Sequence, residues 1–88
     1  MKYYVLRDSK GDALMLVEVF FLTTHDDGLG PDKKCSYNLH SALCERFRWY
    51  CTDDEMDEAE WESMLVMGVL PAITVIVSPT GATFASRT

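Results

Sequence analysis

Cys35 is the residue of this sequence with the greatest capacity for covalent chemistry. It follows a polar loop and two lysines in the stretch KKCSYN, and a helix is predicted to begin directly after it, at Ser36. The attacking species in disulfide exchange is the thiolate, and a thiol of pKa ~8.5 is mostly protonated at neutral pH. Unpaired N–H groups and the positive dipole at a helix N-terminus, with Lys33 and Lys34 adjacent, would lower that pKa. The position therefore predicts a nucleophile; the alternative is a small buried side chain, the commoner role of a single cysteine.

The other cysteines and the two histidines form no recognisable chemical motif. Cys44 lies nine residues from Cys35, which at ~100° per residue places it on the opposite side of a helix. The three cysteines have neither the spacing of a disulfide framework nor that of a zinc site, and neither histidine pairs with a cysteine at ligand spacing. The sequence therefore predicts no metal site and gives Cys35 no resolving partner at Cys44.

The length and the charge of the chain limit its classes of function. Its 88 residues predict one domain spanning 1–88. The net charge of −6 argues against nucleic-acid and anionic-membrane partners, because phosphate binding depends on clustered Lys and Arg. No apolar run reaches ~18 residues, and residues 1–12 lack the apolar core of a secretory signal. We therefore expect a cytoplasmic protein.

The chain is predicted to begin with a β-hairpin. Strands are expected over 3–8 and 13–24, separated by a turn in which Gly11 can take a positive φ. The second strand is almost continuously apolar, which is typical of a strand covered on both faces. A loop rich in Gly and Asp follows over 25–34.

Two helices are predicted after this loop. The first runs from about 36 to 50, where apolar residues recur three and four apart, although 48–51 could instead be a short strand. The second begins at a capping box formed by Thr52 and Glu55 and ends before Gly68, a residue suited to a helix C-terminus.

A second hairpin is predicted at the end of the chain. Its strands cover 71–77 and 82–86, and the turn between them contains Pro79 and Gly81. Together the elements predict an α/β fold with a mixed central sheet, an N-terminal and a C-terminal β-hairpin, and two helices.

Four features follow one another along residues 16–86. They are an apolar strand ending in Thr-Thr, the motif C-S-Y-N that starts at Cys35, a second helix ending in Gly-Val, and Leu70-Pro71 opening the hairpin VLPAITVIVSPTGATF. In this order they resemble the thioredoxin and glutaredoxin superfamily, whose members place C-x-x-C after the first core strand and a proline, usually cis, before the penultimate hairpin. The resemblance implies a minimal thioredoxin-like fold and thiol–disulfide oxidoreductase activity.

The resemblance also implies roles for the residues of the cysteine motif. Cys35 would be the attacking thiolate, and Ser36 and Tyr37 would be the intervening pair, with Tyr37 bordering the substrate groove. Lys34 would bind a carboxylate of glutathione. The substrate would be a disulfide-containing protein or glutathione, and glutathione as a co-substrate is the only cofactor expected.

The same resemblance assigns the substrate-binding wall to Leu70 and Pro71. Pro71, in cis, would face Cys35 across the site, and Leu70 would offer backbone groups to an extended peptide or to glutathione. Without the resemblance, Pro71 is simply a residue that stops a helix before a strand. The sequence leaves both interpretations open.

Asn38 departs from the family pattern, because it occupies the place of the second cysteine. Without a resolving thiol, the usual two-cysteine cycle cannot close within the motif. The chain would then act as a monothiol through a mixed disulfide with glutathione, form stable mixed disulfides, or lack redox activity. No helix follows Ser86, so we also expect one face of the sheet to be barer than in the family.

Residues 53–62 hold seven carboxylates in ten positions. In the first turns of a helix they would oppose the positive helix end and form a solvated face. They could instead dock a basic protein partner. Two hypotheses result: a thiol–disulfide oxidoreductase acting through Cys35, and a non-catalytic acidic binding module or inhibitor that uses the 53–62 helix face.

Overall fold

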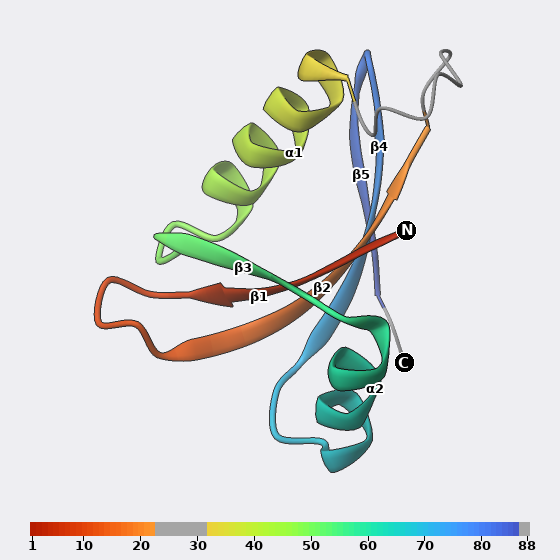
Figure 1. Cartoon of the computed structure of the whole chain (residues 1–88). Helices are drawn as coiled ribbons and strands as arrows, with labels where there is room; N and C mark the ends of the chain where they lie inside the picture. Colours follow the sequence, from red (N-terminus) through yellow and green to blue (C-terminus); the bar gives the residue numbers. More distant parts are fainter. Residues whose placement is uncertain (23–31, 87–88) are drawn as a thin grey trace.

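The apolar run after Gly11 forms the central strand of a five-stranded sheet in the computed structural model (Figure 1). The structure describes residues 1–22 and 32–86. Most of the loop predicted over 25–34 lies outside these ranges. The last two residues of the strand predicted over 13–24 also lie outside them. The elements in chain order are β1 (Lys2–Arg7), β2 (Ala13–Phe21), α1 (Lys33–Arg46), β3 (Thr52–Met56), α2 (Glu58–Met67), β4 (Ala72–Ser78) and β5 (Gly81–Ser86).

Both predicted hairpins are present. β1 and β2 pair antiparallel, and Gly11 in the turn between them has φ +86°, as predicted. The Asp8 carboxylate stabilises this turn by accepting hydrogen bonds from the backbone N–H groups of Lys10 (2.9 Å) and Asp12 (3.0 Å). β4 and β5 form the second antiparallel hairpin.

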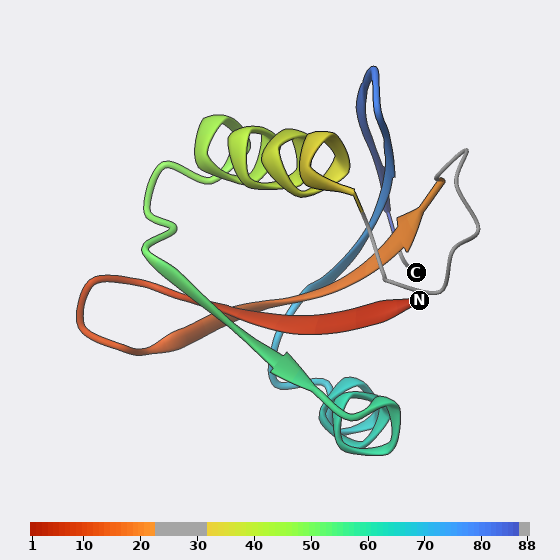
Figure 2. The ribbon, with the colours of Figure 1, turned by 45° about the horizontal axis from the view of Figure 1, so that its top comes forward.

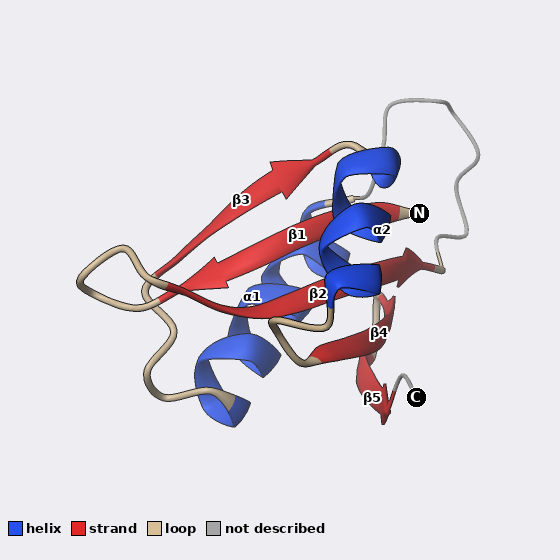
Figure 3. Cartoon of the chain, turned by 90° about the horizontal axis from the view of Figure 1, so that it is seen from below, coloured by secondary structure: helices blue, strands red, loops and turns tan. Residues whose placement is uncertain are grey.

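The sheet is mixed, with the strand order β3-β1-β2-β4-β5 (Figure 3). β2 and β4 are parallel, whereas the other neighbouring strands are antiparallel. The two hairpins therefore lie side by side through β2 and β4, and β3 and β5 form the edges. The predicted α/β class, with a mixed sheet, two hairpins and two helices, is confirmed at this level.

Each helix covers one face of the sheet (Figure 2). On the α1 face, alternate residues of β2 such as Val17 and Val19 pack with Leu39 and Leu43 of the helix. On the α2 face, a smaller buried cluster contains Val5, Leu16 and Trp61. The prediction that β2 is covered on both faces is confirmed, because its residues from Leu16 to Val19 are buried.

The predicted capping box of Thr52 and Glu55 is wrong. These residues belong to β3, and α2 begins only at Glu58 with Asp57 as its N-cap. β3 forms because it pairs antiparallel with β1 along its whole length. Met56 also packs into the α2-face cluster. The segment 48–51, considered above as a strand, is instead the connection between α1 and β3.

The predicted end of α2 is confirmed, and both ends of α1 are shifted. Gly68 caps α2 in the left-handed region with φ +68°. α1 begins at Lys33 rather than Ser36, since Asp32 caps it, and it ends at Arg46 rather than at residue 50. The earlier start places Cys35 within the first turn of the helix rather than before it.

Candidate functional site

Cys35 lies inside the first turn of α1 and points into the core. Its side chain has 0% of its surface exposed, and it belongs to the same buried cluster as Leu39 and Leu43. These three residues are four apart, so they share one face of the helix. The thiol Sγ donates to the backbone carbonyl of Leu22 at 3.8 Å.

The environment of Cys35 raises the pKa of its thiol. The main cause is desolvation, and the Asp32 carboxylate adds to it through a hydrogen bond and through its negative charge. The backbone N–H of Cys35 donates to Asp32 Oδ1 at 2.7 Å, so a carboxylate already occupies this helix end. The prediction of a lowered pKa is therefore wrong. Lys33 and Lys34, which were expected to lower it, are exposed to solvent.

The other residues of the cysteine motif do not surround the thiol. Lys34, Ser36 and Tyr37 lie on the exposed side of α1, and Tyr37 has 71% of its surface exposed. Asn38 has a structural contact: its Nδ2 donates to the carbonyl of Ser78 at 2.9 Å. It thereby attaches α1 to the end of β4.

Leu70 and Pro71 lie far from Cys35. Cys35 contacts Leu22, whose N–H donates to Val77 near the end of β4, whereas Pro71 directly precedes β4. Six residues of strand span about 20 Å. Leu70 packs in the α2-face cluster, on the other side of the sheet.

The expected arrangement of Pro71 opposite Cys35 is therefore absent. The reason is topological: β4 runs parallel to β2, so the start of β4 lies at the opposite end of the sheet from the start of α1. The peptide bond before Pro71 is trans, since no cis peptide bond occurs in the described ranges. Pro71 instead uses its carbonyl to accept the N–H of Leu16 at 2.9 Å, which begins the β2–β4 pairing.

The remaining thiols are exposed and unpaired. All three cysteines are free, and Cys44 and Cys51 lie at the surface. Cys44 Sγ is 3.5 Å from Nε2 of His40, one turn earlier in α1, so the expectation that neither histidine pairs with a cysteine is wrong for these two residues. Within residues 1–22 and 32–86, no group of three or more His, Cys, Asp or Glu is placed to hold a metal ion.

A second candidate site is the acidic surface, which we define as the seven carboxylates of β3, α2 and the residue between them. It spans the edge strand and the first two turns of the helix (Figure 3). All of its members are exposed except Glu62, which is half-buried. The members are Asp53, Asp54, Glu55, Asp57, Glu58, Glu60 and Glu62.

Only part of this charge is neutralised by cations. Arg7 Nε lies 2.7 Å from Asp54 Oδ2, and Lys2 Nζ lies 3.2 Å from Glu55 Oε2; these are the two ion pairs between the described residues. Both pairs join β1 to β3 and are solvent-exposed, so each contributes at most about 1 kcal/mol. The acidic surface therefore retains a net negative charge.

Tyr3 responds to this negative charge. Its ring packs against Trp61, with the centroids 5.1 Å apart. The pKa of Tyr3 is raised, first by desolvation and then by the charge and hydrogen bonding of Glu58 and the charges of Glu18 and Glu62. Two of these carboxylates, Glu58 and Glu62, belong to the acidic surface, which therefore acts on a side chain of β1.

Glu18 is a buried carboxylate that sequence analysis did not single out. It lies in β2 with 6% of its surface exposed and accepts a hydrogen bond of 2.7 Å from Thr74 Oγ1 on β4. The signal in the sequence was a single charged residue within the apolar run LMLVEVFF. Buried carboxylates need such partners because desolvation is costly.

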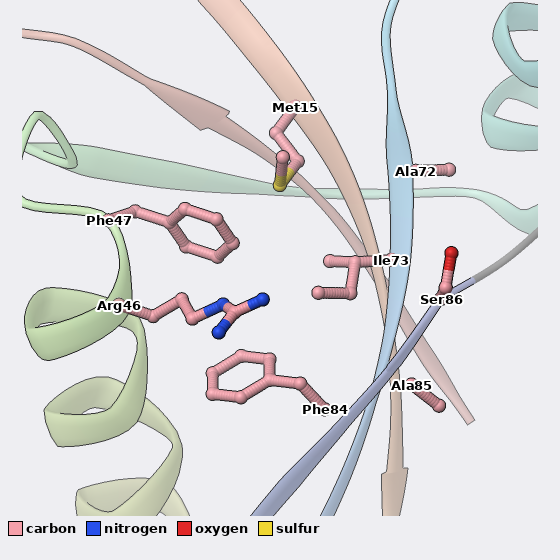
Figure 4. A pocket seen from close by; sticks show the side chains of 8 residues that line it. All are labelled: Met15, Arg46, Phe47, Ala72, Ile73, Phe84, Ala85 and Ser86. Carbon is pink, nitrogen blue, oxygen red and sulfur yellow. The ribbon is translucent and has the colours of Figure 1, made fainter.

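An open hollow lies between the end of α1 and the β4–β5 hairpin (Figure 4). The guanidinium of Arg46 is 5.3 Å from the centre of the Phe84 ring, and Phe47 packs edge-on against that ring at 6.0 Å. Met15 and Ile73 line the apolar side. None of the described residues that line the hollow is a Cys, His, Asp or Glu, so the hydroxyl of Ser86 has no general base beside it.

Comparisons with protein-family models, with curated proteins and with solved structures find no match to this chain. None of the described helices combines the length and the apolar character needed to cross a membrane.

Proposed function

We propose that this protein is a non-catalytic binding module that docks a basic protein partner on the acidic surface. The observation that carries the proposal is that at least six carboxylates are exposed along β3 and the start of α2. Among the described residues, two cations form ion pairs with them, so most of these carboxylates are not neutralised. Surfaces of one charge sign attract partners of the opposite sign and increase their association rate. The net charge of −6 acts in the same direction.

The scaffold beneath the acidic surface favours a binding role. β3 is held by its full pairing with β1, and α2 is anchored by the buried Trp61, whose Nε1 donates to the Tyr4 carbonyl at 3.2 Å. The carboxylates therefore project from fixed backbone. A prearranged surface loses less conformational entropy when it binds.

The proposal is tested by removing charge from the acidic surface without disturbing its internal contacts. Asp57 and Glu60 are exposed, and no ion pair of the described residues includes them. The variant Asp57→Asn/Glu60→Gln is compared with Asp12→Asn/Glu45→Gln, which removes the same charge from exposed positions elsewhere. Proteins cross-linked to the wild type in a lysate of the source organism are identified by mass spectrometry.

We expect a defined basic protein to be lost with Asp57→Asn/Glu60→Gln and kept with the control variant. Raising the salt concentration should weaken its capture, because exposed charges are screened. Equal capture by wild type and both variants would contradict the proposal. Equal loss from both variants would also contradict it, since the net charge of the whole protein would then be responsible.

A second candidate is thiol–disulfide exchange at Cys35 in a thioredoxin-like fold. Its support is the free thiol in the first turn of α1 and the order of elements that prompted the resemblance. The burial of Cys35, its raised pKa and the distance of Pro71 weigh against it. Rapid alkylation of native Cys35 near neutral pH would favour this second candidate over the binding module.

A further inference from the structure

The two edges of the sheet differ in charge. β3 at one edge carries Asp53, Asp54 and Glu55, whereas β5 at the other edge has the sequence GATFAS, without a charged residue or a proline. Exposed edges are usually protected from pairing with other chains by charges, prolines or bulges. β3 has such protection through its carboxylates, and β5 has none of these features.

The hydrogen bonds of β4 show which of its residues face β2. The N–H of Leu16 donates to the carbonyl of Pro71 at 2.9 Å, and the N–H of Leu22 donates to that of Val77 at 2.7 Å. In a regular parallel pair, the bonding residues of each strand alternate. The odd-numbered residues of β4 therefore bond to β2, and the even-numbered residues face β5.

This alternation determines which backbone groups of β5 remain open. Ile76 of β4 is paired with Thr83 of β5, so Thr83 directs its N–H and C=O inward, as does every second residue of β5. No strand of the described ranges pairs with the other side of β5. The residues that direct their N–H and C=O groups to this open edge are Ala82, Phe84 and Ser86.

The side chains along β5 leave room for another strand. On the α2 face, Thr83 and Ala85 are small and exposed, beside the exposed Ile76. On the α1 face, Phe84 lies beneath the guanidinium of Arg46. An incoming strand thus meets small side chains on one face and an aromatic ring with a cation on the other.

We propose that β5 is a self-association edge, where a second copy of this chain adds its own β5 in antiparallel orientation. When residues 82–86 of the two copies pair antiparallel about Phe84, Phe84 pairs with Phe84 and Ala82 pairs with Ser86. Each residue that directs its N–H and C=O groups to the open edge therefore meets a residue of the second copy that does the same. Because β5 contains no charged residue, this alignment places no charged side chain of one β5 strand against the other.

The charge distribution favours a second copy at this edge over any other contact between copies. Two copies each carry a net charge of −6 and repel one another at the acidic surface. β5 is four strand spacings from β3, or about 19 Å, which exceeds the Debye length at physiological salt. Pairing at the β5 edge therefore keeps the acidic surfaces of two copies apart, and the charge placed over this edge in each copy is the guanidinium of Arg46 on Phe84.

The contact is small, so the dimer should dissociate on dilution. Pairing of one short strand falls in the class of interfaces below ~1,200 Å², which form weak complexes. Sedimentation of the wild type from about 10 µM to 1 mM covers the dissociation constants typical of such contacts. We expect the weight-average mass to rise from monomer toward dimer over this range.

A pair of variants with equal charge tests the location of the contact. Thr83→Lys/Ala85→Lys places lysines opposite lysines of the second copy, whereas Thr52→Lys/Ser63→Lys adds the same charge at exposed positions away from β5. We expect the first variant to raise the dissociation constant at least tenfold and the second to leave dimerisation intact. A monomer mass throughout, or equal weakening by both variants, would overturn the proposal.

Amide hydrogen exchange of the unmodified protein provides a second test that needs no variant. Exchange at Phe84 and Ala82 should slow as the protein concentration increases, because the dimer covers their N–H groups. Exchange at Thr83 and Ala85 should be slow already in the monomer, since those N–H groups bond to β4. Concentration-independent exchange at Phe84 would overturn the proposal even if another contact produced dimers.

Discussion

The Asp32 carboxylate accepts the backbone N–H of Cys35 at 2.7 Å, and the same contact places a negative charge beside a buried thiol. An N-cap carboxylate compensates the helix dipole that would otherwise stabilise a thiolate. Desolvation acts in the same direction. The position that predicted a reactive cysteine is therefore one in which the thiol stays protonated.

Alkylation of the native protein should distinguish Cys35 from the other two thiols. Cys44 and Cys51 are exposed, whereas Cys35 is buried. At pH 8 we expect two alkyl groups per chain in the native state and a third only after addition of denaturant, as counted by intact-mass spectrometry. Peptide mapping that finds native Cys35 labelled as fast as Cys44 would contradict this placement.

The raised pKa of Cys35 should make stability depend on pH in the alkaline range. The unfolded thiol ionises near pH 8.5, while the folded thiol holds its proton to higher pH. The stabilisation is complete below about pH 8.5 and decreases as the pH rises toward the folded pKa, because the unfolded state then loses the proton first. Urea unfolding between pH 7 and about 9.5 measures this slope.

The variant Cys35→Ala should show a smaller loss of stability over the same pH range. It is less stable overall, since it leaves a cavity in the core, but it removes the titrating group. Cys44→Ala is the matched control, because it removes an exposed thiol and leaves the buried Cys35 in place, so it should keep the pH dependence that Cys35 produces. Identical slopes for wild type and Cys35→Ala would show that the thiol does not titrate as described.

The parts of the fold that were predictable are those determined by neighbouring residues. Gly11 and Gly68 both adopt the positive φ expected at a turn and at a helix end, and each requirement is local. The hairpins depend on such turns and on short apolar runs. They could therefore be identified before any long-range pairing was known.

The wrong predictions concern segments whose structure depends on distant partners. The sequence TDDE satisfies the local rule for a capping box, but these residues form β3 because they pair with β1, about 50 positions earlier in the chain. The hydrogen bond between Arg7 and Asp54 is an example of this pairing. A local pattern carries no information about such a partner.

The prediction of a reactive thiol at Cys35 was wrong for a similar reason. Its chemistry depended on where α1 begins, and a shift from Ser36 to Lys33 moved Cys35 onto the buried face of the helix. The expected partner Pro71 depended on the direction of β4 relative to β2, which the sequence does not encode locally. The acidic run could be recognised from composition, but its division between a strand and a helix could not.

Asn38 should contribute to stability through its hydrogen bond to Ser78 rather than to catalysis. Asn38→Ala removes the 2.9 Å bond that joins α1 to the end of β4, and we expect its free energy of unfolding to be about 1 kcal/mol lower than that of Ser36→Ala. Ser36→Ala is the control, because it is an exposed substitution in the same helix with a similar gain in helix propensity. Chemical denaturation that finds both variants equally stable would argue that the bond contributes nothing.

The buried pair of Thr74 and Glu18 should be the polar contact of the sheet most sensitive to substitution. Thr74→Val keeps the shape of the side chain but removes the hydroxyl that donates to Glu18 Oε1 at 2.7 Å. A buried carboxylate that loses a donor keeps its desolvation cost, so the free energy of unfolding should fall by roughly 1–3 kcal/mol. Thr83→Val, an exposed change on β5, should alter stability by less than about 0.5 kcal/mol. The double variant Glu18→Met/Thr74→Val completes a cycle with the two single variants, each of which removes one partner of the hydrogen bond, and a coupling energy near zero would contradict a direct interaction between the two side chains.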